Sequence, residues 1–191
     1  LHVRKRLSGG IEMAKSRRCE VLVVGAGPGG YVAAIRAAQL GLDTIIVEGS
    51  RAGGTCLIRG CIPSKAIIHA AERFEALAEH AAEAGHMGIK AEDPKIEMEA
   101  LIDWKDGIVD RLNKGVETLL AKAGADLLHG WATFRDAKTC DVQLTDGDVV
   151  RIQASNVILA TGSSPIDLPF MPIDGDRVIS STEALELDNL P

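Results

Sequence analysis

Two cysteines, Cys56 and Cys61, are separated by four residues in the sequence GGTCLIRGCIPSK. A pair that cycles between dithiol and disulfide needs its Cα atoms within about 7 Å, and this spacing, with Gly60 inside it, allows that geometry. Pro63 favours the first turn of a helix, so Cys61 would lie at a helix N-terminus, where the helix dipole lowers the pKa of a thiol. Lys65 would add positive charge one turn further on. The spacing therefore predicts redox chemistry.

Two other interpretations of this pair remain open, namely two buried inert thiols or a zinc site. Zinc needs four ligands, and the nearest candidate, His69, has no obvious companion. The remaining cysteines, Cys19 and Cys140, are expected to be small core residues. Four cysteines in 191 residues are too few for a secreted disulfide scaffold, which favours a reducing compartment.

A glycine-rich turn with the spacing GxGxxG precedes the pair, at Gly25, Gly27 and Gly30. The first glycine permits a tight turn, the second lets a pyrophosphate approach the backbone, and the third lets the helix and strand pack closely. The helix N-terminus then offers its free N–H groups to the phosphates. Glu48 ends the next apolar run, where a carboxylate can accept hydrogen bonds from ribose hydroxyls. The pattern predicts a dinucleotide site but does not distinguish FAD from NAD.

The hydrophobic pattern predicts the elements that position these residues. The expected elements are, in order, a strand at 19–24, a helix at 29–40, a strand at 44–47, a loop at 49–60, helices at 62–84 and 95–124, and strands at 125–134, 139–144, 149–153 and 156–159. The first three form a βαβ unit, in which the two strands are parallel. The chain therefore belongs to the α/β class, with short strands towards its C-terminal end.

The overall composition excludes several classes of function. A net charge of -6 and an aromatic content of 3% argue against a nucleic-acid partner. No apolar run reaches the roughly 18 residues that a membrane span needs. Residues 1–18 are basic and contain few apolar residues, which predicts a disordered or tag-like leader rather than a secretory signal.

The cysteine segment closely resembles the active site of the pyridine nucleotide-disulfide oxidoreductases, and its Ile-Pro-Ser-Lys ending is most similar to that of the dihydrolipoyl dehydrogenases within that family. The sequence ATGSSP at 160–165 is similar to the family's second flavin-contacting motif. The resemblance implies an FAD/NAD(P)-binding, Rossmann-like three-layer fold with a small antiparallel β-meander. It also implies an FAD-binding domain at 19–163 and a connector at 164–191.

The resemblance further implies roles for individual residues. Cys56 would exchange with dihydrolipoamide, and Cys61 would be the thiolate in charge-transfer contact with the flavin. The FAD would be bound tightly but not covalently, and no metal is implied. The residues implied to contact FAD are Gly25, Gly27, Pro28, Gly29, Gly30, Glu48, Gly53, Gly54, Thr55, Cys56, Lys65, Gly130, Thr161, Gly162 and Ser163.

By the same resemblance, electrons would pass from dihydrolipoamide through the disulfide to FAD and then to NAD. The implied partners are a lipoyl domain that carries the substrate, a 2-oxo acid dehydrogenase complex and a second copy of the chain in a homodimer. The implied location is the bacterial cytoplasm or, in a eukaryote, the mitochondrial matrix. Mercuric and glutathione reductases share the fold and the cysteine pair, so these substrates remain open, as does a non-catalytic flavin-binding module.

Two departures from the family pattern affect these expectations. Ile58 and Arg59 replace an asparagine and a small apolar residue between the cysteines. Because the cysteine spacing is intact, we expect tuning of the site rather than loss of its chemistry. The family's chains are also much longer, and their second glycine signature for NAD and their C-terminal domain with the acid–base histidine would follow Pro191. We therefore expect an incomplete FAD domain with little turnover of its own.

Overall fold

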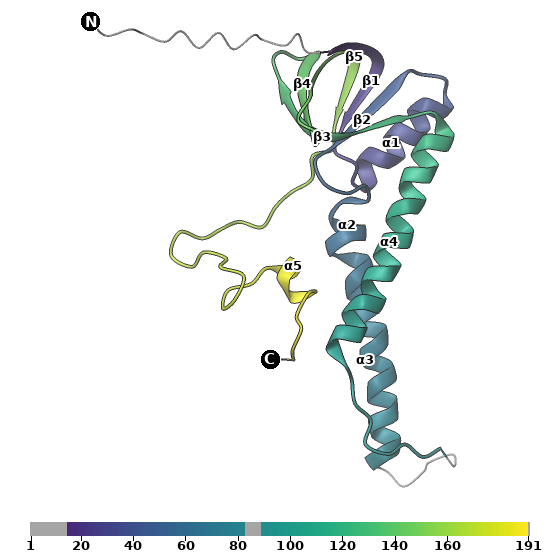
Figure 1. Ribbon diagram of the computed structural model, residues 1–191, viewed down its shortest axis with the longest axis vertical. Helices are drawn as coiled ribbons and strands as arrows, with labels where there is room; N and C mark the ends of the chain where they lie inside the picture. The colour runs from purple at the N-terminus through teal and green to yellow at the C-terminus, as the bar shows by residue number, and fades with distance from the viewer. Residues whose placement is uncertain (1–14, 83–88, 191) are drawn as a thin grey trace, which may run out of the picture.

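The computed structural model describes residues 15–82 and 89–190 of the chain. The sheet lies at one end of the molecule, and two long helices extend away from it (Figure 1). The elements are β1 (Lys15–Val24), α1 (Pro28–Gln39), β2 (Thr44–Glu48), α2 (Gly54–Arg59), α3 (Cys61–Ala82), α4 (Met98–Ala123), β3 (Asp126–Phe134), β4 (Thr139–Leu144), β5 (Val149–Leu159) and α5 (Ser181–Ala184). This order confirms the predicted α/β class.

Four strands form a parallel sheet in the order β3–β2–β1–β5. Strand β4 runs antiparallel to both β3 and β5, and so closes the sheet into a ring. The predicted meander is therefore β3–β4–β5, but it is not a separate unit, because β3 and β5 continue from the parallel sheet. The prediction of two short strands at 149–153 and 156–159 was wrong in one respect, because these residues form the single strand β5.

Alternate side chains of the central strands supply two cores, one on each face of the sheet. Val21 and Val23 of β1 lie in the cluster that includes residues of α1 and α4. Leu22 lies in the cluster on the other face, together with Cys19 and Cys140. The alternation from Val21 to Val23 follows the two-residue period of a strand, whereas Cys19 shares the face of Leu22. The result is helices, parallel sheet and antiparallel strands as three layers, as predicted, and both outlying cysteines are core residues.

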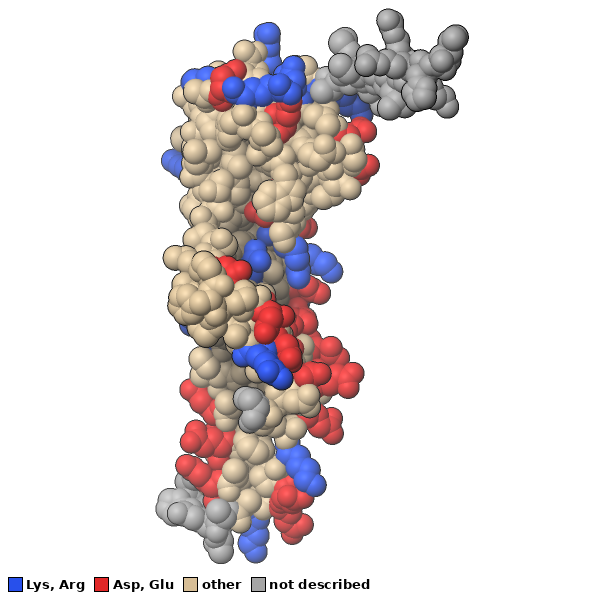
Figure 2. All heavy atoms as spheres, turned by 90° about the vertical axis from the view of Figure 1, so that its left-hand side faces the viewer, with Lys and Arg blue, Asp and Glu red and all other residues tan. Residues whose placement is uncertain are grey.

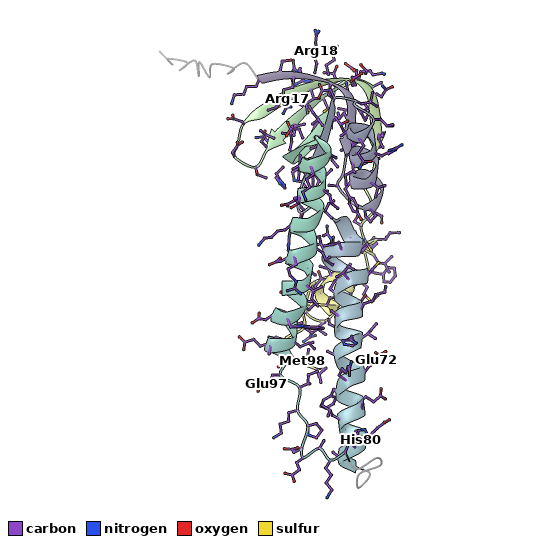
Figure 3. The ribbon with its side chains drawn as sticks, turned by 90° about the vertical axis from the view of Figure 1, so that its right-hand side faces the viewer. Arg17, Arg18, Glu72, His80, Glu97 and Met98 are labelled. Carbon is purple, nitrogen blue, oxygen red and sulfur yellow. The ribbon has the colours of Figure 1, made fainter. Side chains whose placement is uncertain are left out.

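The first strand begins earlier than expected. Residues 15–18, which the composition placed in a disordered leader, pair with β5 as part of β1. Arg17 forms an ion pair with Asp126 at 2.6 Å, and Figure 3 shows Arg17 and Arg18 at the sheet end of the molecule. Lys15 and Arg17 are therefore strand residues with acidic partners. The remainder of the predicted leader, residues 1–14, lies outside the described residues.

Helices α3 and α4 lie side by side, and both were predicted to within a few residues. Glu97 and Met98, at the start of α4, lie level with the stretch of α3 between Glu72 and His80 (Figure 3). Acidic side chains gather over this helical half on the face shown in Figure 2. Among the described residues, no helix is both long and apolar enough to cross a membrane.

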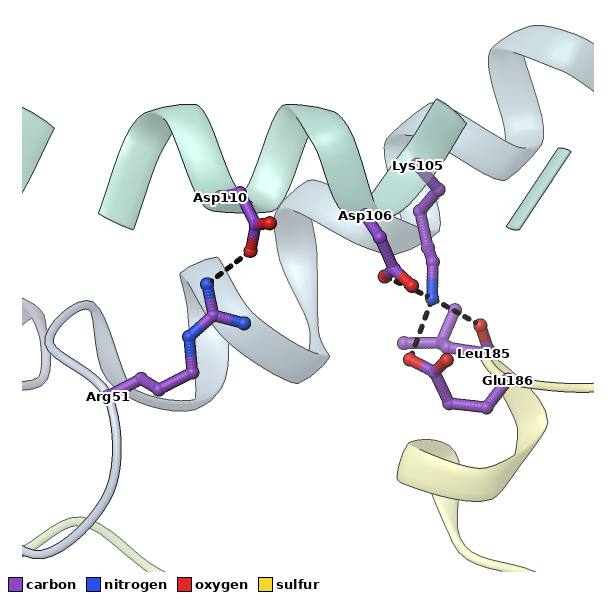
Figure 4. A network of polar contacts seen from close by, with 6 residues as sticks. All are labelled: Arg51, Lys105, Asp106, Asp110, Leu185 and Glu186. Carbon is purple, nitrogen blue, oxygen red and sulfur yellow. Dashed lines mark hydrogen bonds and ion pairs between the residues drawn. The ribbon is translucent and has the colours of Figure 1, made fainter. Parts of the chain in front are cut away.

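The segment after β5 is attached to α4 by a buried lysine. Lys105 is fully buried, and its Nζ donates hydrogen bonds to the carbonyl oxygen of Leu185 at 3.0 Å and to Glu186 at 2.7 Å. Asp106 lies 3.0 Å from the same nitrogen (Figure 4). A buried cation needs such partners, because removing its charge from water is costly. Lys105 therefore anchors the end of the predicted connector.

Replacing Lys105 with methionine should loosen this attachment. Methionine retains an apolar chain of similar length but has no ammonium group. The oxygens of Leu185, Glu186 and Asp106 then lose their charged donor, which should lower the unfolding free energy by about 1–3 kcal/mol. We expect faster proteolysis within residues 164–190 and a lower unfolding free energy in urea. Lys114→Met, at an exposed position of the same helix, is the matched control. Equal proteolysis rates for the wild type and Lys105→Met would contradict the anchoring role.

Candidate functional site

A cleft of about 570 Å³ opens at the carboxyl ends of the parallel strands. The register places the ends of β1, β2 and β5 level with one another, because Val24 pairs with both Val47 and Leu159. Such an edge is where open α/β sheets bind ligands, and the volume lies within the roughly 300–1,000 Å³ of small-molecule sites. The lining residues are Gly25, Gly27, Pro28, Gly29, Glu48, Gly54, Thr55, Cys56, Arg59, Gly60, Cys61, Ala160, Thr161, Gly162 and Ser163.

Most residues singled out from the sequence come together in this cleft, but Gly30, Gly53, Lys65 and Gly130 are not among its lining residues. Gly30 is buried behind the turn, whereas Lys65 is exposed on α3. Gly130 is buried in β3, where a Cβ would overlap the carbonyl oxygen of Gln143. Close packing of β3 against β4 therefore explains this glycine, and its expected contact with FAD stays a prediction.

Three lining residues, Arg59, Gly60 and Ala160, were not predicted as site residues. The sequence identifies Arg59 only as a departure from the family pattern, and the segment around it was expected to be a loop. That expectation was wrong, since residues Gly54–Arg59 form the helix α2. The two glycines at its start are typical of a loop, which is why the helix was not predicted. The buried side chain of Leu57 packs α2 against the core.

The glycine turn leaves the start of α1 available to an anion. Gly27 is the N-cap residue and offers no capping side chain, and Pro28 occupies the first turn. The first bond of the helix runs from the N–H of Tyr31 to the carbonyl of Gly27, at 2.9 Å. The N–H groups of Gly29 and Gly30 precede this bond, and with the helix dipole they suit a pyrophosphate.

Glu48 holds the turn from the end of β2. Its carboxylate accepts hydrogen bonds from the N–H groups of Ala26 at 2.7 Å and Ser50 at 2.9 Å. An ionised carboxylate has about four acceptor positions, so capacity remains for ribose hydroxyls. Gly54, at φ +61°, brings α2 against the turn, because a Cβ there would stand 2.5 Å from the Cα of Gly27. The residues of the cleft thus fit a dinucleotide such as FAD.

The two cysteines meet at the junction of two helices. Cys56 belongs to α2, and Cys61 is the first residue of α3. The pKa of Cys56 is raised, chiefly because its thiol hydrogen-bonds to Cys61; burial and negative charge on Cys61 act in the same direction, while Lys65 opposes them. Cys61 is exposed, so this thiol is not a buried inert residue. Both cysteines line the same cleft at the junction of α2 and α3, as the two members of a redox pair must.

The four thiols should differ sharply in reactivity. Burial raises the pKa of Cys19 to about 11, and burial also raises the pKa of Cys140. At about pH 8, only about one Cys19 in a thousand would be the reactive thiolate. We expect iodoacetamide to label Cys61 in the folded protein and to label Cys19 and Cys140 only after denaturation, as read by peptide mass spectrometry. Comparable labelling rates for Cys19 and Cys61 in the folded protein would contradict this expectation.

Known proteins resemble the chain over most of its length. The pyridine nucleotide-disulphide oxidoreductase family model matches residues 19–191. A dihydrolipoyl dehydrogenase of Pseudomonas aeruginosa is 50% identical over 94% of this chain and 38% of its own length. One of Geobacillus stearothermophilus is 49% identical over 90% of this chain and 35% of its own length.

A solved structure, LpdA from Mycobacterium tuberculosis, has the same fold, with a TM-score of 0.77 and 24% identity over 90% of this chain and 38% of that one. The chain thus spans less than two fifths of the length of these relatives. The family match nevertheless covers the glycine turn, both cysteines and the segment after β5. The chain belongs to the pyridine nucleotide-disulphide oxidoreductase family.

Proposed function

We propose that the chain is the FAD-binding part of a dihydrolipoyl dehydrogenase, with Cys56 and Cys61 as its redox pair. The observation that carries this proposal is the presence of both cysteines in the cleft that also contains the free start of α1. The family and the names of the similar proteins support an oxidoreductase that uses a flavin and a pyridine nucleotide. Dihydrolipoamide as the donor and NAD as the acceptor are the finer part of the proposal.

The cysteines carry out the exchange with substrate. One thiolate of dihydrolipoamide attacks Cys56 of the oxidised pair, which forms a mixed disulfide and releases Cys61 as a thiolate. The second substrate thiol then attacks the substrate sulfur of that mixed disulfide, which closes the ring of lipoamide and releases Cys56. Two electrons and two protons leave the substrate. The raised pKa of Cys56 favours its return to the protonated thiol.

The other residues of the cleft hold the cofactor. The start of α1 would bind the pyrophosphate, and the carboxylate of Glu48 would accept hydrogen bonds from the ribose hydroxyls. Residues 161–163, which line the cleft beyond β5, would cover the bound molecule. When bound, FAD takes up the electron pair of the dithiol and delivers it to NAD.

A second, apolar cleft favours a lipoyl substrate over glutathione. This cleft has a volume of about 310 Å³ and shares Cys56 with the first. Its lining residues are Pro28, Tyr31, Gly53, Cys56, Leu57, Ile62, Leu112, Gly115, Val116 and Leu119, none of which is charged. Such a surface suits the hydrocarbon arm of lipoamide, whereas the carboxylates and the ammonium group of glutathione would lose water there without a partner.

Comparing two cyclising dithiols tests this function. The oxidised protein is mixed with dihydrolipoamide or with dithiothreitol, which lacks the hydrocarbon arm, and alkylation counts the free thiols at Cys56 and Cys61. We expect the reduction rate to saturate with dihydrolipoamide and to rise linearly with dithiothreitol. The product of the complete gene, loaded with FAD, should also reduce NAD with dihydrolipoamide. Identical concentration dependence for the two dithiols, together with no NAD reduction, would exclude the proposal.

A further inference from the structure

One peptide unit between β2 and α2 is held from both sides. The carbonyl oxygen of Ala52 accepts a hydrogen bond of 2.7 Å from Nδ2 of Asn113 on α4. The N–H of Gly53, in the same peptide unit, donates a hydrogen bond of 2.7 Å to the carbonyl of Ala26 in the glycine turn. Because a peptide unit is planar, fixing both of its polar groups fixes its orientation.

This peptide belongs to a chain of hydrogen bonds that ends in the nucleotide cleft. The N–H of Ala26 donates to the carboxylate of Glu48, and the carbonyl of Ala26 accepts from Gly53. Asn113 completes the chain at its other end. The bonds made by Asn113 and by the N–H of Gly53 share one peptide unit, and hydrogen bonds in series through a peptide strengthen one another in a low-dielectric interior. The bond to Glu48 comes from the preceding peptide of the same turn. The floor of the cleft and helix α4 are thereby joined through the backbone that leads to Cys56.

Asn113 occupies a position where an apolar side chain would be expected. It is only 7% exposed and lies on the buried face of α4 between Val109 and Val116, one helical turn or less from each. An amide buried without a partner costs about 1–3 kcal/mol, so its bond to Ala52 is needed to keep it there. At this core position of α4, the polar side chain is therefore explained by its bond to the Ala52–Gly53 peptide.

The peptide is separated from Cys56 by a very short stretch of chain. Gly53 and Gly54 both adopt backbone conformations with positive φ, at +118° and +61°. Helix α2 begins at Gly54. Gly54 also packs directly on Gly27 of the turn. Turning the Ala52–Gly53 peptide would therefore move the first turn of α2, which contains Cys56.

We propose that Asn113 is a positioning residue that sets Cys56 against Cys61 and against the nucleotide turn by orienting the Ala52–Gly53 peptide. Asn113 lines neither cleft, so it acts through the peptide and not on a ligand. This inference rests on the proposed redox role of the two cysteines, but its test needs neither substrate nor cofactor.

The pH test must take account of every charged and titratable group around Cys56. Cys61 and Lys65 come from α3, and Arg59 comes from α2. Tyr31 of α1 lines the second cleft together with Cys56. Glu48 faces the same cleft from β2. Helix α4 contributes only apolar groups beside Cys56. Contact with Cys61 is the chief cause that raises the pKa of Cys56, so separating the thiols should return this pKa towards its ordinary value.

The test compares alkylation of Cys56 across pH in the reduced protein without cofactor. Asn113→Asp has the same size but offers only acceptors to the Ala52 carbonyl, and Asn113→Leu offers neither donor nor acceptor. We expect both variants to label Cys56 roughly threefold faster or more at about pH 8, with the midpoint of its profile moved to lower pH. Asp110→Asn is the control, because it breaks only the Arg51–Asp110 ion pair, whose side chains are both exposed.

Each outcome of this comparison decides the proposal. Faster labelling of Cys56 in both Asn113 variants, with wild-type labelling in Asp110→Asn, supports it. A wild-type profile in either folded Asn113 variant, even with a lower melting temperature, would reduce Asn113 to a structural residue. If Asn113→Asp fails to fold, Asn113→Leu alone carries the test. If dihydrolipoamide failed to reduce the cysteine pair, the proposed function would be contradicted, but the outcome of the alkylation comparison would still stand.

Discussion

Replacing either Cys56 or Cys61 with serine is expected to abolish NAD reduction by dihydrolipoamide in the complete enzyme. A single thiol cannot form the internal disulfide that takes up the two electrons of the substrate, so the reaction stops before the cofactor is reached. Both thiols line the cleft, and no other cysteine pair among the described residues shares it. Because both residues act in one step, the double variant should be no worse than either single variant.

The two single variants should still differ in one respect. Cys61→Ser keeps the thiol that is proposed to meet substrate, so it should form a mixed disulfide with an activated lipoyl thiol, whereas Cys56→Ser should form it more slowly. Mass spectrometry of the intact protein measures this difference. Cys19→Ala is the control and should keep most of the activity. Cys19 lies in the core on the face of the sheet opposite to helices α1 and α4. Substantial NAD reduction by either cysteine variant would contradict the proposed route.

Adding one methyl group to the glycine turn should have an effect that depends entirely on which glycine receives it. A Cβ at Gly30 would overlap the carbonyl oxygen of Gly25 and would lie 3.3 Å from the Cβ of Ala160. A Cβ at Gly29, the preceding residue, would have no atom within 4 Å. We expect Gly30→Ala to destabilise the fold by about 3 kcal/mol or more, because backbone must move. Gly29→Ala should be neutral or stabilising by up to about 1 kcal/mol.

Urea unfolding of the protein without cofactor measures this difference directly. Each variant serves as the control for the other, since both add the same atoms to the first turn of the same helix. Equal unfolding free energies for the two variants would show that the close approach of α1 to the turn is not what requires Gly30.

Much of the fold could be predicted because its signals are local. The apolar runs of β1 and β2, the glycine turn and the start of α3 each depend on a few neighbouring residues. The beginning of β1 could not be predicted in this way. Lys15 and Arg17 resemble a disordered basic segment until their partners, Asp148 and Asp126, are brought beside them by the fold.

The same reasoning explains what was missed in β5. Residues 154–155 were expected to separate two strands, but they continue the strand because β1 pairs with Ala154 and Asn156, on both sides of Ser155. The side chain of Asn156 also donates to the carbonyl of Glu20, at 3.3 Å. Residues that interrupt the apolar pattern are thus held in an extended strand by the neighbouring strand β1.

The cysteine pair and the glycine turn could be predicted from the sequence, but the buried polar residues that hold neighbouring segments in place could not. Asn113 and Lys105 both lie at buried positions of α4, where periodicity predicts apolar side chains. Their partners, Ala52 and Leu185, are distant in sequence and accept through backbone carbonyls. A backbone carbonyl is present at every residue, so the sequence does not indicate which one is the acceptor. Such polar core residues are found only when the fold is known.

Titration of the protein with FAD, with alkylation of Cys61 followed in parallel, tests the central claim that one cleft joins the nucleotide turn to the thiol pair. We expect one FAD per chain, displacement by ADP, and slower alkylation of Cys61 in proportion to FAD occupancy, because both line the same cleft. FAD binding that ADP does not displace, or that leaves Cys61 as reactive as in the free protein, would contradict the claim.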